Sequence, residues 1–571
     1  MGVSLRDLYS RACNRFESWP WTHSWKLGIG LIIGAAFTWI LIGFAGPSTV
    51  ALTLGERHSL LPPWYLPYQY SGWSQWIVVP ALWLAISAAA IGLWICMNAL
   101  AHGWNPRPWK LFGMGAGLSA ATACVLPMTS ADVLMYAAYG RIQILGMNPY
   151  DITPAEIARQ EYDPVLHLTE PPWTDTPSVY GPIATWTQWL AAYLGGDNLH
   201  DIVFWLQMLA LIPFLVCGLV AIYLAGGHSL PSLRAVRKFG HDVIGYGASG
   251  ARHGAAVSDG KTGRFAGIKR ILPDWNHRNQ AQARAVLFTV ANPLMIWAVL
   301  AGAHNEALTL VFAIVALLFL RRYPFFAGVA IGLAGATKVS LVFYGLAMLW
   351  AYRFSLKRVL LLGVGALVPL GLAYGLWAPD ALLAARRNVG YVSAGSWAPF
   401  FTEIFELFWP NDFSRQVVTW IGWAGMFVIA YLLSRVLPWS PAPGSLLGAR
   451  IERDPLTVTC RTAVILTTAW LVTSPYSLSW YDIIVWVPLG MLAASKLDKI
   501  MVWRGGWLSV AYVAARAVKF DPEINQLNWV IRDLLCSAAQ LLVLAALIAW
   551  GISGVRKNGW WGCFKPAGDH K

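Results

Sequence analysis

Charged residues are scarce in this chain. Only 12% of its 571 residues are Asp, Glu, Lys or Arg, and 57% are hydrophobic, whereas soluble globular proteins carry about 25% charged residues. This shortage of charge excludes an ordinary soluble protein and indicates an integral membrane protein. The formal net charge of +14 would suggest nucleic-acid binding in a soluble chain. Here we attribute it to basic loops on one side of a membrane and expect no nucleic-acid partner.

Several common functional motifs are also absent. The seven cysteines include no CxxC pair, so we expect neither a disulfide framework nor a cysteine metal site. The chain has no Walker A sequence, and its acidic loop has no DxD motif, which disfavours ATP chemistry and a metal–diphosphate clamp for a nucleotide sugar. Only isolated carboxylates are available as metal ligands, so we expect no essential metal and no cofactor. The N-terminus has no cleavable signal pattern.

Long apolar segments are plentiful. A membrane span needs about 20 mainly apolar residues. The sequence predicts spans at 26–45, 75–100, 111–126, 201–225, 285–301, 307–320, 359–377, 417–437, 463–473, 483–494, 507–518 and 534–551, with a short pair at 325–337 and 341–351 that joins at Lys338. We therefore predict an all-α polytopic membrane protein with about 12–14 transmembrane helices.

Loop charges predict the orientation of these spans. The segment 128–198 contains eight acidic residues against Arg141 and Arg159, whereas 226–282 is strongly basic and rich in Gly, Ala and Ser. Cytoplasmic loops of membrane proteins carry an excess of Lys and Arg, so the basic loop is predicted inside and the acidic loop outside.

The predicted organisation has five parts. They are a cytoplasmic N-terminus (1–25), an N-terminal transmembrane module (26–225) with the outer loop 128–198, a flexible cytoplasmic loop (226–282), a C-terminal transmembrane module (283–552) and a cytoplasmic tail (553–571).

The stretch 127–150 carries the strongest functional signal. It places the carboxylate of Asp132 just past a predicted span, ahead of an amphipathic helix with Tyr136, Tyr139 and Arg141. We predict that Asp132 is a general base, although a carboxylate at this position could instead cap the helix. The Asn148-Pro149-Tyr150 sequence is predicted either as a turn or as a sugar contact.

Other polar residues fall at the predicted outer ends of distant segments. A charge in hydrocarbon costs at least about 2.5–3.5 kcal/mol, so such residues usually have a function. Their gathering on one face predicts a single site at the outer membrane boundary. The further candidates are Tyr180, His304, Asn305, Glu306, Lys338, Arg386, Arg387, Tyr476, Trp480, Tyr481 and Asp482.

Transfer of a sugar from a lipid phosphate fits this set of residues. A carboxylate can deprotonate an acceptor hydroxyl, and cations can stabilise a departing phosphate. We expect Lys338, with Arg141 or the pair Arg386 and Arg387, to bind the phosphate. Structural alternatives remain: Lys338 could snorkel to the interface, and the tyrosines and Trp480 could form an aromatic belt.

The ordered motifs ADVLMYAAYGR and GMNPYD (131–151), SVYGP (178–182), AHNEA (303–307), TK (337–338) and SPYSLSWY (474–481) resemble the polyprenol-phosphomannose-dependent α-1,6-mannosyltransferases of the actinobacterial cell envelope. The resemblance spans about residues 26–550. It implies a GT-C membrane glycosyltransferase of the plasma membrane, with amphipathic helices and its active site on the extracytoplasmic side.

The resemblance also implies the substrates and the roles of individual residues. The donor would be polyprenyl-phosphate mannose, the acceptor a lipid-linked mannan such as the lipomannan backbone, and the reaction an inversion to an α-1,6 linkage. Asp132 would be the catalytic acid of the family, and His304, Asn305 and Glu306 would position sugar hydroxyls. This chain has Glu306 where the family often has Asp.

Two alternative functions remain open from the sequence. An arabinosyltransferase of the same fold would use polyprenyl-phosphate arabinose. A lipid-linked sugar flippase would need a polar path through the membrane and usually an internal repeat, and we find no repeat.

Overall fold

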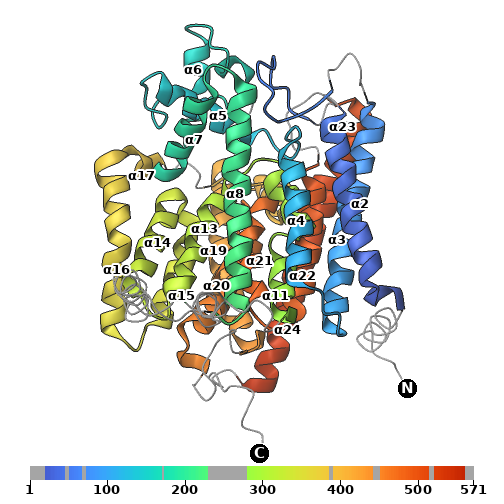
Figure 1. Cartoon of the computed structure of the whole chain (residues 1–571), viewed down its shortest axis with the longest axis vertical. Helices are drawn as coiled ribbons and strands as arrows, with labels where there is room; N and C mark the ends of the chain where they lie inside the picture. Colours follow the sequence, from blue (N-terminus) through green and yellow to red (C-terminus); the bar gives the residue numbers. More distant parts are fainter. Residues whose placement is uncertain are drawn as a thin grey trace, which may run out of the picture.

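The computed structural model describes residues 20–45, 51–66, 73–169, 173–228, 230, 279–384, 390–440, 451–513 and 520–559. All regular secondary structure in these residues is helical, as the sequence predicted. Long helices stand roughly side by side, and shorter helices gather at one end of the bundle (Figure 1).

The N-terminal module is built from four long helices. After the short turn η1 (Pro20–His23), α2 (Trp25–Phe44) packs along α3 (Gln75–Ala101) and also contacts α4 (Pro108–Ala123). The fully buried Trp39 donates a hydrogen bond from Nε1 to Thr122 Oγ1 at 3.0 Å, so its one polar atom is satisfied inside the apolar packing. α8 (Leu199–Ala225) packs against α4 and returns the chain to the opposite end.

The centre of the bundle is a helix shielded from lipid. It consists of α11 (Asn279–Phe288), α12 (Pro293–Met295) and the π-helical turn η4 (Ile296–Leu300), and 94% of its apolar window is buried. A helix that is apolar on all sides belongs in such a position. Asn292 Oδ1 accepts a hydrogen bond from Leu294 N at 3.1 Å and caps the restarted helix.

Four short helices and one long helix follow. They are α13 (Glu306–Phe319), α14 (Pro324–Thr337), η5 (Val339–Leu341), α15 (Val342–Ala351) and α16 (Leu356–Leu370), which continues as the π-helical η6 (Gly371–Trp377). α14 packs closely on α16, because a Cβ at Gly328 would lie 3.0 Å from Ala366 N and no side chain intervenes. The predicted break at Lys338 is present between α14 and η5.

The C-terminal module completes the bundle. α20 (Pro455–Thr473) packs on both α15 and α19 (Asn411–Val436), and η8 (Ile451–Arg453) precedes it. η9 (Ser479–Asp482), α21 (Ile483–Gly490) and α22 (Lys496–Ala511) follow. The last described element is the continuous helix formed by α23 (Pro522–Trp529), η10 (Val530–Leu535) and α24 (Cys536–Asn558).

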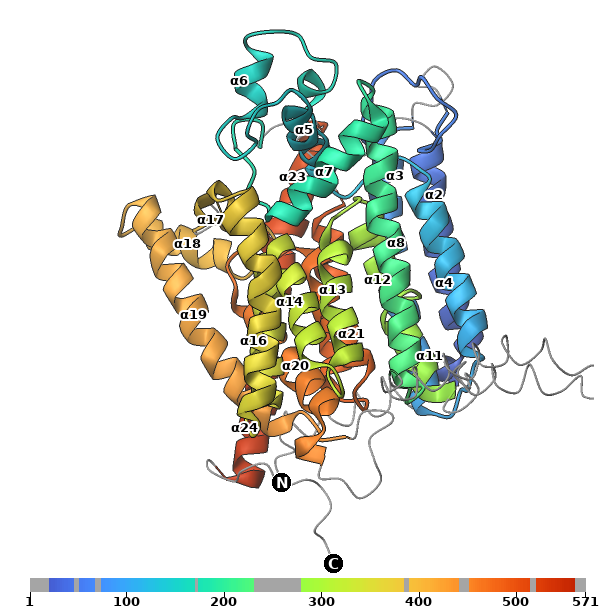
Figure 2. The same ribbon diagram turned by 60° about the vertical axis from the view of Figure 1, so that its left-hand side comes forward.

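Short helices form a cap over one end of the bundle. They are α5 (Asp132–Ile144), α6 (Pro154–Ala158), η3 (Leu166–Leu168), α7 (Pro182–Gly195), α17 (Asp380–Ala384) and α18 (Ala398–Glu406) (Figure 2). Within the cap, Arg141 bonds Asp163 at 2.7 Å and Asp197 at 2.5 Å. We use the word cap below for these helices and the loops that join them.

Eight helices of the described residues are long and apolar enough to cross a membrane. They start at Trp25, Gln75, Leu199, Asn279, Leu356, Asn411, Pro455 and Pro522. The other expected crossings are shorter, and three of them are α13, α14 and η5 with α15. Several of the short helices end at the cavity described below, where irregular backbone is tolerated because it lines a polar site and not lipid.

Charges sort by end of the bundle. The helix ends and turns remote from the cap carry Arg107, Lys110, Arg321, Arg322, Arg353, Lys357, Arg358, Arg556 and Lys557, whereas the described part of the cap carries ten acidic residues against Arg141 and Arg159. The predicted basic loop 226–282 lies mostly outside the described residues, so the orientation in the membrane stays a prediction.

Candidate active site

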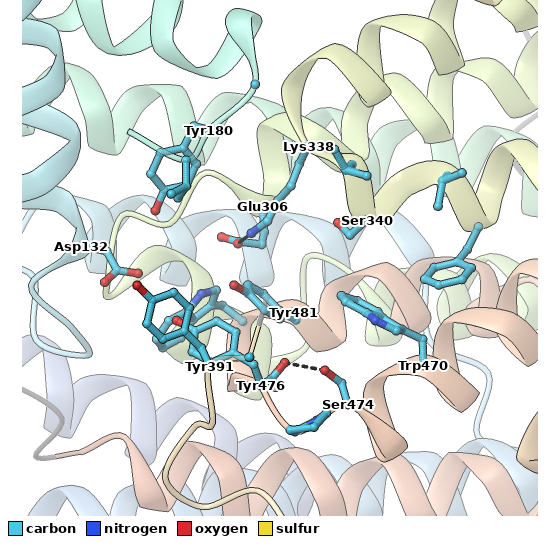
Figure 3. A pocket seen from close by; sticks show the side chains of 18 of the residues that line it. Asp132, Tyr180, Glu306, Lys338, Ser340, Tyr391, Trp470, Ser474, Tyr476 and Tyr481 are labelled. Atoms are coloured by element: carbon cyan, nitrogen blue, oxygen red, sulfur yellow. Dashed lines mark hydrogen bonds and ion pairs between the residues drawn. The ribbon is translucent and has the colours of Figure 1, made fainter. Parts of the chain in front are cut away.

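A cavity of about 360 Å³ lies where the cap meets the bundle. Its wall combines α5, the segment before α7, the α14–η5–α15 junction, α19, α20 and η9 (Figure 3). These segments are distant in sequence. The sequence predicted that polar residues from such distant segments would meet in one site. The predicted residues that line it are Asp132, Tyr136, Tyr139, Tyr180, Glu306, Lys338, Tyr476, Trp480 and Tyr481.

Asp132 is the first residue of α5 and faces the cavity. The N-cap residue Ala131 makes no side-chain capping bond, and Ser130 Oγ accepts the Asp132 N–H at 3.1 Å. The Asp132 carboxylate is 20% exposed, and its Oδ2 lies 3.5 Å from His304 Nδ1. Its orientation into the cavity favours a role in chemistry over a role as a helix cap.

The environment of Asp132 makes it a weaker acid than usual. Burial raises the pKa of its carboxyl to about 7 and the charge of Glu306 acts in the same direction, while Lys338 and a hydrogen bond with Ser130 lower the pKa. A general base works best when its pKa is near the operating pH. Asp132 is therefore suited to take a proton near neutral pH.

His304 lies behind the cavity wall, next to Asp132. The ring is fully buried, stacks on Trp480 at a centroid distance of 3.7 Å, and places Nε2 3.3 Å from Thr129 Oγ1. Burial, aided by the charge of Lys338, holds the pKa of His304 well below its usual value, so the imidazole is neutral. Its Nδ1 is too far from Asp132 for a good hydrogen bond and has no other partner among the described residues.

The backbone before His304 is strained. Ala303 has a φ of 53°, a left-handed conformation that costs an L-residue with a Cβ about 1–2 kcal/mol. Such outliers gather at functional sites, where the surrounding structure holds them in place. Here the outlier turns the chain between η4 and α13 and positions the His304-Asn305-Glu306 sequence beside Asp132.

Lys338 and Glu306 form an ion pair in the cavity wall. The Lys338 Nζ lies 2.5 Å from Glu306 Oε1 and 4.1 Å from the centre of the Tyr481 ring. Lys338 is 21% exposed and Glu306 only 4%. The Oε2 atom of Glu306 has no hydrogen-bond partner among the described residues, and Glu306 lines the cavity, so this atom can accept a hydrogen bond from a ligand or from water. The predicted residues His304 and Asn305 do not line the cavity.

Gly181 explains why Tyr180 reaches this site. Its N–H bonds the Thr337 carbonyl oxygen at 3.2 Å, and a Cβ at Gly181 would lie 2.8 Å from that oxygen. The absence of a side chain therefore lets the start of α7 touch the end of α14, next to Lys338. Tyr180 then packs edge-on against Tyr136 at a centroid distance of 5.2 Å.

A buried arginine, Arg504, holds the turn 474–482, which carries Tyr476, Trp480 and Tyr481 and is called the aromatic turn below. Arg504 is 2% exposed and bonds Ser477 Oγ at 2.6 Å, Asp482 Oδ1 at 3.1 Å and Gln540 Oε1 at 3.0 Å. Ser477 and Asp482 flank most of the aromatic residues of the turn, so this network fixes the rings that line the cavity. The predicted outer-end residue Asp482 is thus a buried support and does not line the cavity.

The cavity has two chemically different ends. The membrane end is lined by residues of α15, α19 and α20: Val342, Phe343, Trp423, Met426 and Trp470. The outer end is lined by residues of two cap segments: Trp173, Thr176, Val179, Gly390 and Tyr391. α15 and α19 both pack on α20, and Val342 and Trp423 are about half exposed, so these two cavity-lining side chains also lie at the surface of the bundle.

Some predicted residues lie elsewhere. Arg141 is engaged with Asp163 and Asp197 inside the cap and does not line the cavity. Asn148 and Tyr150 line a separate, smaller cavity of about 200 Å³. The Tyr150 hydroxyl is bonded to the Thr185 hydroxyl. Arg386 and Arg387 lie outside the described residues.

Sequence reasoning missed several residues that line the cavity. Trp173, Tyr391, Tyr374, Trp470 and Ser340 are in this group. Ser340 lies two residues after the predicted break at Lys338, which could have identified it. The other four carry no local signal, because tryptophan and tyrosine are common throughout this chain.

In the described part of the chain, no group of three or more His, Cys, Asp or Glu residues is placed to hold a metal ion. The independence from metals therefore stays a prediction.

Comparison with known proteins identifies relatives. The sequence model of the alpha-(1→6)-mannopyranosyltransferase family, N-terminal domain, matches residues 34–237 and 275–353, about half of the chain. A protein of Mycolicibacterium smegmatis named "probable alpha-(1→6)-mannopyranosyltransferase" is 36% identical over 87 residues, which cover 15% of this chain and 15% of that protein. The family match includes Asp132, His304, Glu306 and Lys338.

Proposed function

The chain belongs to the alpha-(1→6)-mannopyranosyltransferase family, and from this premise we propose that it transfers mannose from polyprenyl-phosphate mannose to the 6-hydroxyl of a lipid-linked mannan. One observation carries the proposal: the Asp132 carboxylate, with a pKa of about 7, and the Lys338–Glu306 ion pair share one cavity, which is lined by apolar residues of bundle helices at one end and by the cap at the other.

Asp132 is the general base in this proposal. The acceptor hydroxyl gives its proton to the Asp132 carboxylate as its oxygen attacks the anomeric carbon. The new carbon–oxygen bond forms while the bond to the phosphate oxygen breaks. Attack from the face opposite the phosphate inverts the configuration and gives an α-1,6 linkage from a β-linked donor.

Lys338 binds the donor phosphate and stabilises the charge that develops on it. Buried donors aimed at a developing charge are effective catalysts because they need no reorganisation during the reaction. The phosphate leaves as polyprenyl phosphate with the bonding electron pair, so no proton has to be supplied to it. Glu306 lines the cavity and supplies a free acceptor atom, Oε2, for a sugar hydroxyl.

The membrane end suits the prenyl chain. Its residues Phe343, Trp423 and Met426 belong to helices of the bundle, and a prenyl chain is as apolar as the lipid that it leaves. We propose that the donor enters sideways between α15 and α19, with α20 as the floor, and that the spent carrier leaves by the same way.

We further propose that the protein resides in the plasma membrane with its cap on the extracytoplasmic side. The basic turns at the opposite end support this orientation through the preference of Lys and Arg for the cytoplasm.

The experiment is a transfer reaction with purified protein in lipid nanodiscs. Polyprenyl-phosphate mannose and a synthetic α-1,6-mannobioside are the substrates, and mass spectrometry and NMR identify a trisaccharide with a new α-1,6 linkage. Parallel reactions with polyprenyl-phosphate arabinose and with EDTA test the donor sugar and the independence from metals. Absence of any glycosidic product, with transport of the labelled lipid across the bilayer, would refute the proposal in favour of a flippase.

A further inference from the structure

The outer end of the cavity is bordered by two aromatic residues from separate cap segments. Trp173 precedes α7, and Tyr391 follows α17. Their ring centroids are 5.7 Å apart, and the ring planes stand at 82°. Both residues are half-buried and both line the cavity, so each presents part of its ring to the space inside.

A row of rings connects this pair with the reactive groups. Tyr391 lies 6.1 Å from Tyr476, and Tyr476 lies 6.3 Å from Tyr481, measured between ring centroids. The Tyr481 ring in turn lies under the Lys338 ammonium. Figure 3 shows Tyr391, Tyr476 and Tyr481 grouped along one wall, with Asp132 and Glu306 beside them. A molecule that contacts the outer pair can therefore extend along aromatic surface to the reaction centre.

The Trp173 segment is held in place by the cap. The Tyr139 hydroxyl donates to the Thr176 carbonyl oxygen at 2.8 Å, and the Thr176 N–H donates to the Trp173 carbonyl oxygen at 2.9 Å. The segment is therefore anchored to α5, the helix that carries Asp132.

The Tyr391 segment is held by the aromatic turn. Ser393 Oγ accepts the Ser477 N–H at 2.9 Å, and Ser396 Oγ donates to the Pro475 carbonyl oxygen at 2.9 Å. Because both rings stand on anchored segments, little conformational freedom is lost when a ligand binds between them.

The chemistry of the outer end suits a neutral sugar. Its described lining, Trp173, Thr176, Val179, Gly390 and Tyr391, contains no charged side chain, whereas the phosphate of the donor needs a cation such as Lys338. Aromatic faces pack on the C–H face of a pyranose ring, and the Tyr and Thr hydroxyls can hydrogen-bond its hydroxyls. The residues named above for the membrane end have no hydroxyl groups beside their aromatic rings, so that end suits a glycan less well.

We propose that the outer end is an acceptor subsite, in which Trp173 and Tyr391 bind the mannose residue next to the one that carries the reacting 6-hydroxyl. This inference rests on the proposed function, because it presumes a mannan acceptor. In this proposal Trp173 and Tyr391 of the cap recognise the length of the acceptor, and the membrane helices bind the donor.

The test compares acceptors of one and two sugar residues. In the wild type, we expect the α-1,6-mannobioside to have a lower KM than methyl α-mannoside. Trp173→Ala and Tyr391→Ala should each raise the KM for the mannobioside about tenfold, the effect expected for an aromatic residue at the centre of a binding site. The KM for methyl α-mannoside and the KM for the donor should stay unchanged.

Two controls separate binding from folding. Tyr391→Phe keeps the ring and should keep most of the preference for the mannobioside. Tyr162→Ala removes an aromatic residue of the cap that is 75% exposed and should change no kinetic constant. Thermal unfolding of each variant confirms that its fold is retained.

The outcomes distinguish this inference from the proposed function. If the wild type transfers mannose but neither alanine variant changes the mannobioside KM, or if the donor KM rises instead, the subsite is refuted and the proposed function stands. If the wild type transfers no sugar, calorimetric titration measures whether α-1,6-mannobiose binds to the wild type and to Trp173→Ala, and so tests the subsite without the reaction. Binding by the wild type alone supports the subsite, and absence of binding refutes it.

Discussion

Replacement of Asp132 by Asn gives the sharpest test of the site. The change keeps the shape of the side chain and removes its capacity to accept a proton. A positioned general base contributes about 10²–10⁴-fold to the rate, so kcat for mannosyl transfer should fall by about that factor while the donor KM changes little. Glu56→Gln, which alters a carboxylate that is 94% exposed in an outer loop, should retain full activity.

The pH dependence has a defined sign. The pKa of Asp132 is about 7, and only its deprotonated form can act as the base. The value of kcat/KM in the wild type should therefore fall as the pH decreases below about 7. The residual activity of Asp132→Asn should lack this fall.

The same carboxyl group makes stability depend on pH. Its pKa is raised from 3.8 in a reference state to about 7 in the folded protein, so the folded state holds the proton more tightly than the unfolded state. The stabilisation is full below about pH 4 and is lost as the pH rises through 7. At no more than about 1.36 kcal/mol per pH unit, and less as the pH nears 7 because the folded form itself releases the proton there, the loss between pH 5 and pH 7 is about 2 kcal/mol.

Thermal unfolding in detergent measures this loss as a change in Tm. The Tm of the wild type should decrease from pH 5 to pH 8 by more than the Tm of Asp132→Asn. If Asp132→Asn keeps the activity of the wild type and the same fall of kcat/KM below about pH 7, the role of Asp132 as base is refuted. Equal pH dependence of Tm in both proteins would refute its perturbed environment.

Three further predictions concern the support of the site. Lys338→Met combined with Glu306→Gln leaves no unpaired charge and should weaken donor binding by roughly 1.5–3 kcal/mol, the contribution of a hydrogen bond to a charged group, seen as a higher donor KM; an unchanged donor KM would exclude phosphate binding by Lys338. Arg504→Gln leaves Asp482 buried without its cation and should destabilise the fold by about 3–5 kcal/mol, measured as a lower Tm; a wild-type Tm would contradict the support assigned to it. Gly181→Ala places a Cβ against the backbone of Ala336 and Thr337, so the start of α7 must move away from α14 and both Tm and kcat should fall; a wild-type Tm with full activity would show that this contact is not needed.

The bundle and its ends could be predicted from the sequence, because membrane helices are encoded locally by length and hydrophobicity. The sequence also located the break at Lys338, since a cation between two short apolar pieces interrupts the hydrophobic run that a single span needs. Helix boundaries were harder to predict. The last span was expected at 534–551, whereas the continuous helix begins at Pro522, because the polar residues of α23 conceal its start in the sequence.

Partners of charged residues were the least predictable part of the site. Arg141 was predicted to bind phosphate because it follows Asp132 on the same predicted helix. In the structure its guanidinium forms ion pairs with Asp163 and Asp197 of the cap. Glu306 and Lys338 were both identified, yet their pairing joins α13 to the end of α14 and needs the fold. Trp173 and Tyr391 were missed for the same reason, since only the fold brings them together.

The ion pair between Lys338 and Glu306 bears on how the cavity is emptied. A cation that already has a partner exchanges one anion for another when a phosphate arrives, so the gain in free energy is smaller than for a bare ammonium group. The same exchange operates in reverse, because Glu306 can reclaim Lys338 as the phosphate departs and no buried charge is left alone at either stage. If Lys338 binds the donor phosphate as proposed, this exchange weakens the binding of polyprenyl phosphate and speeds its release. The ion pair therefore favours fast turnover over high affinity.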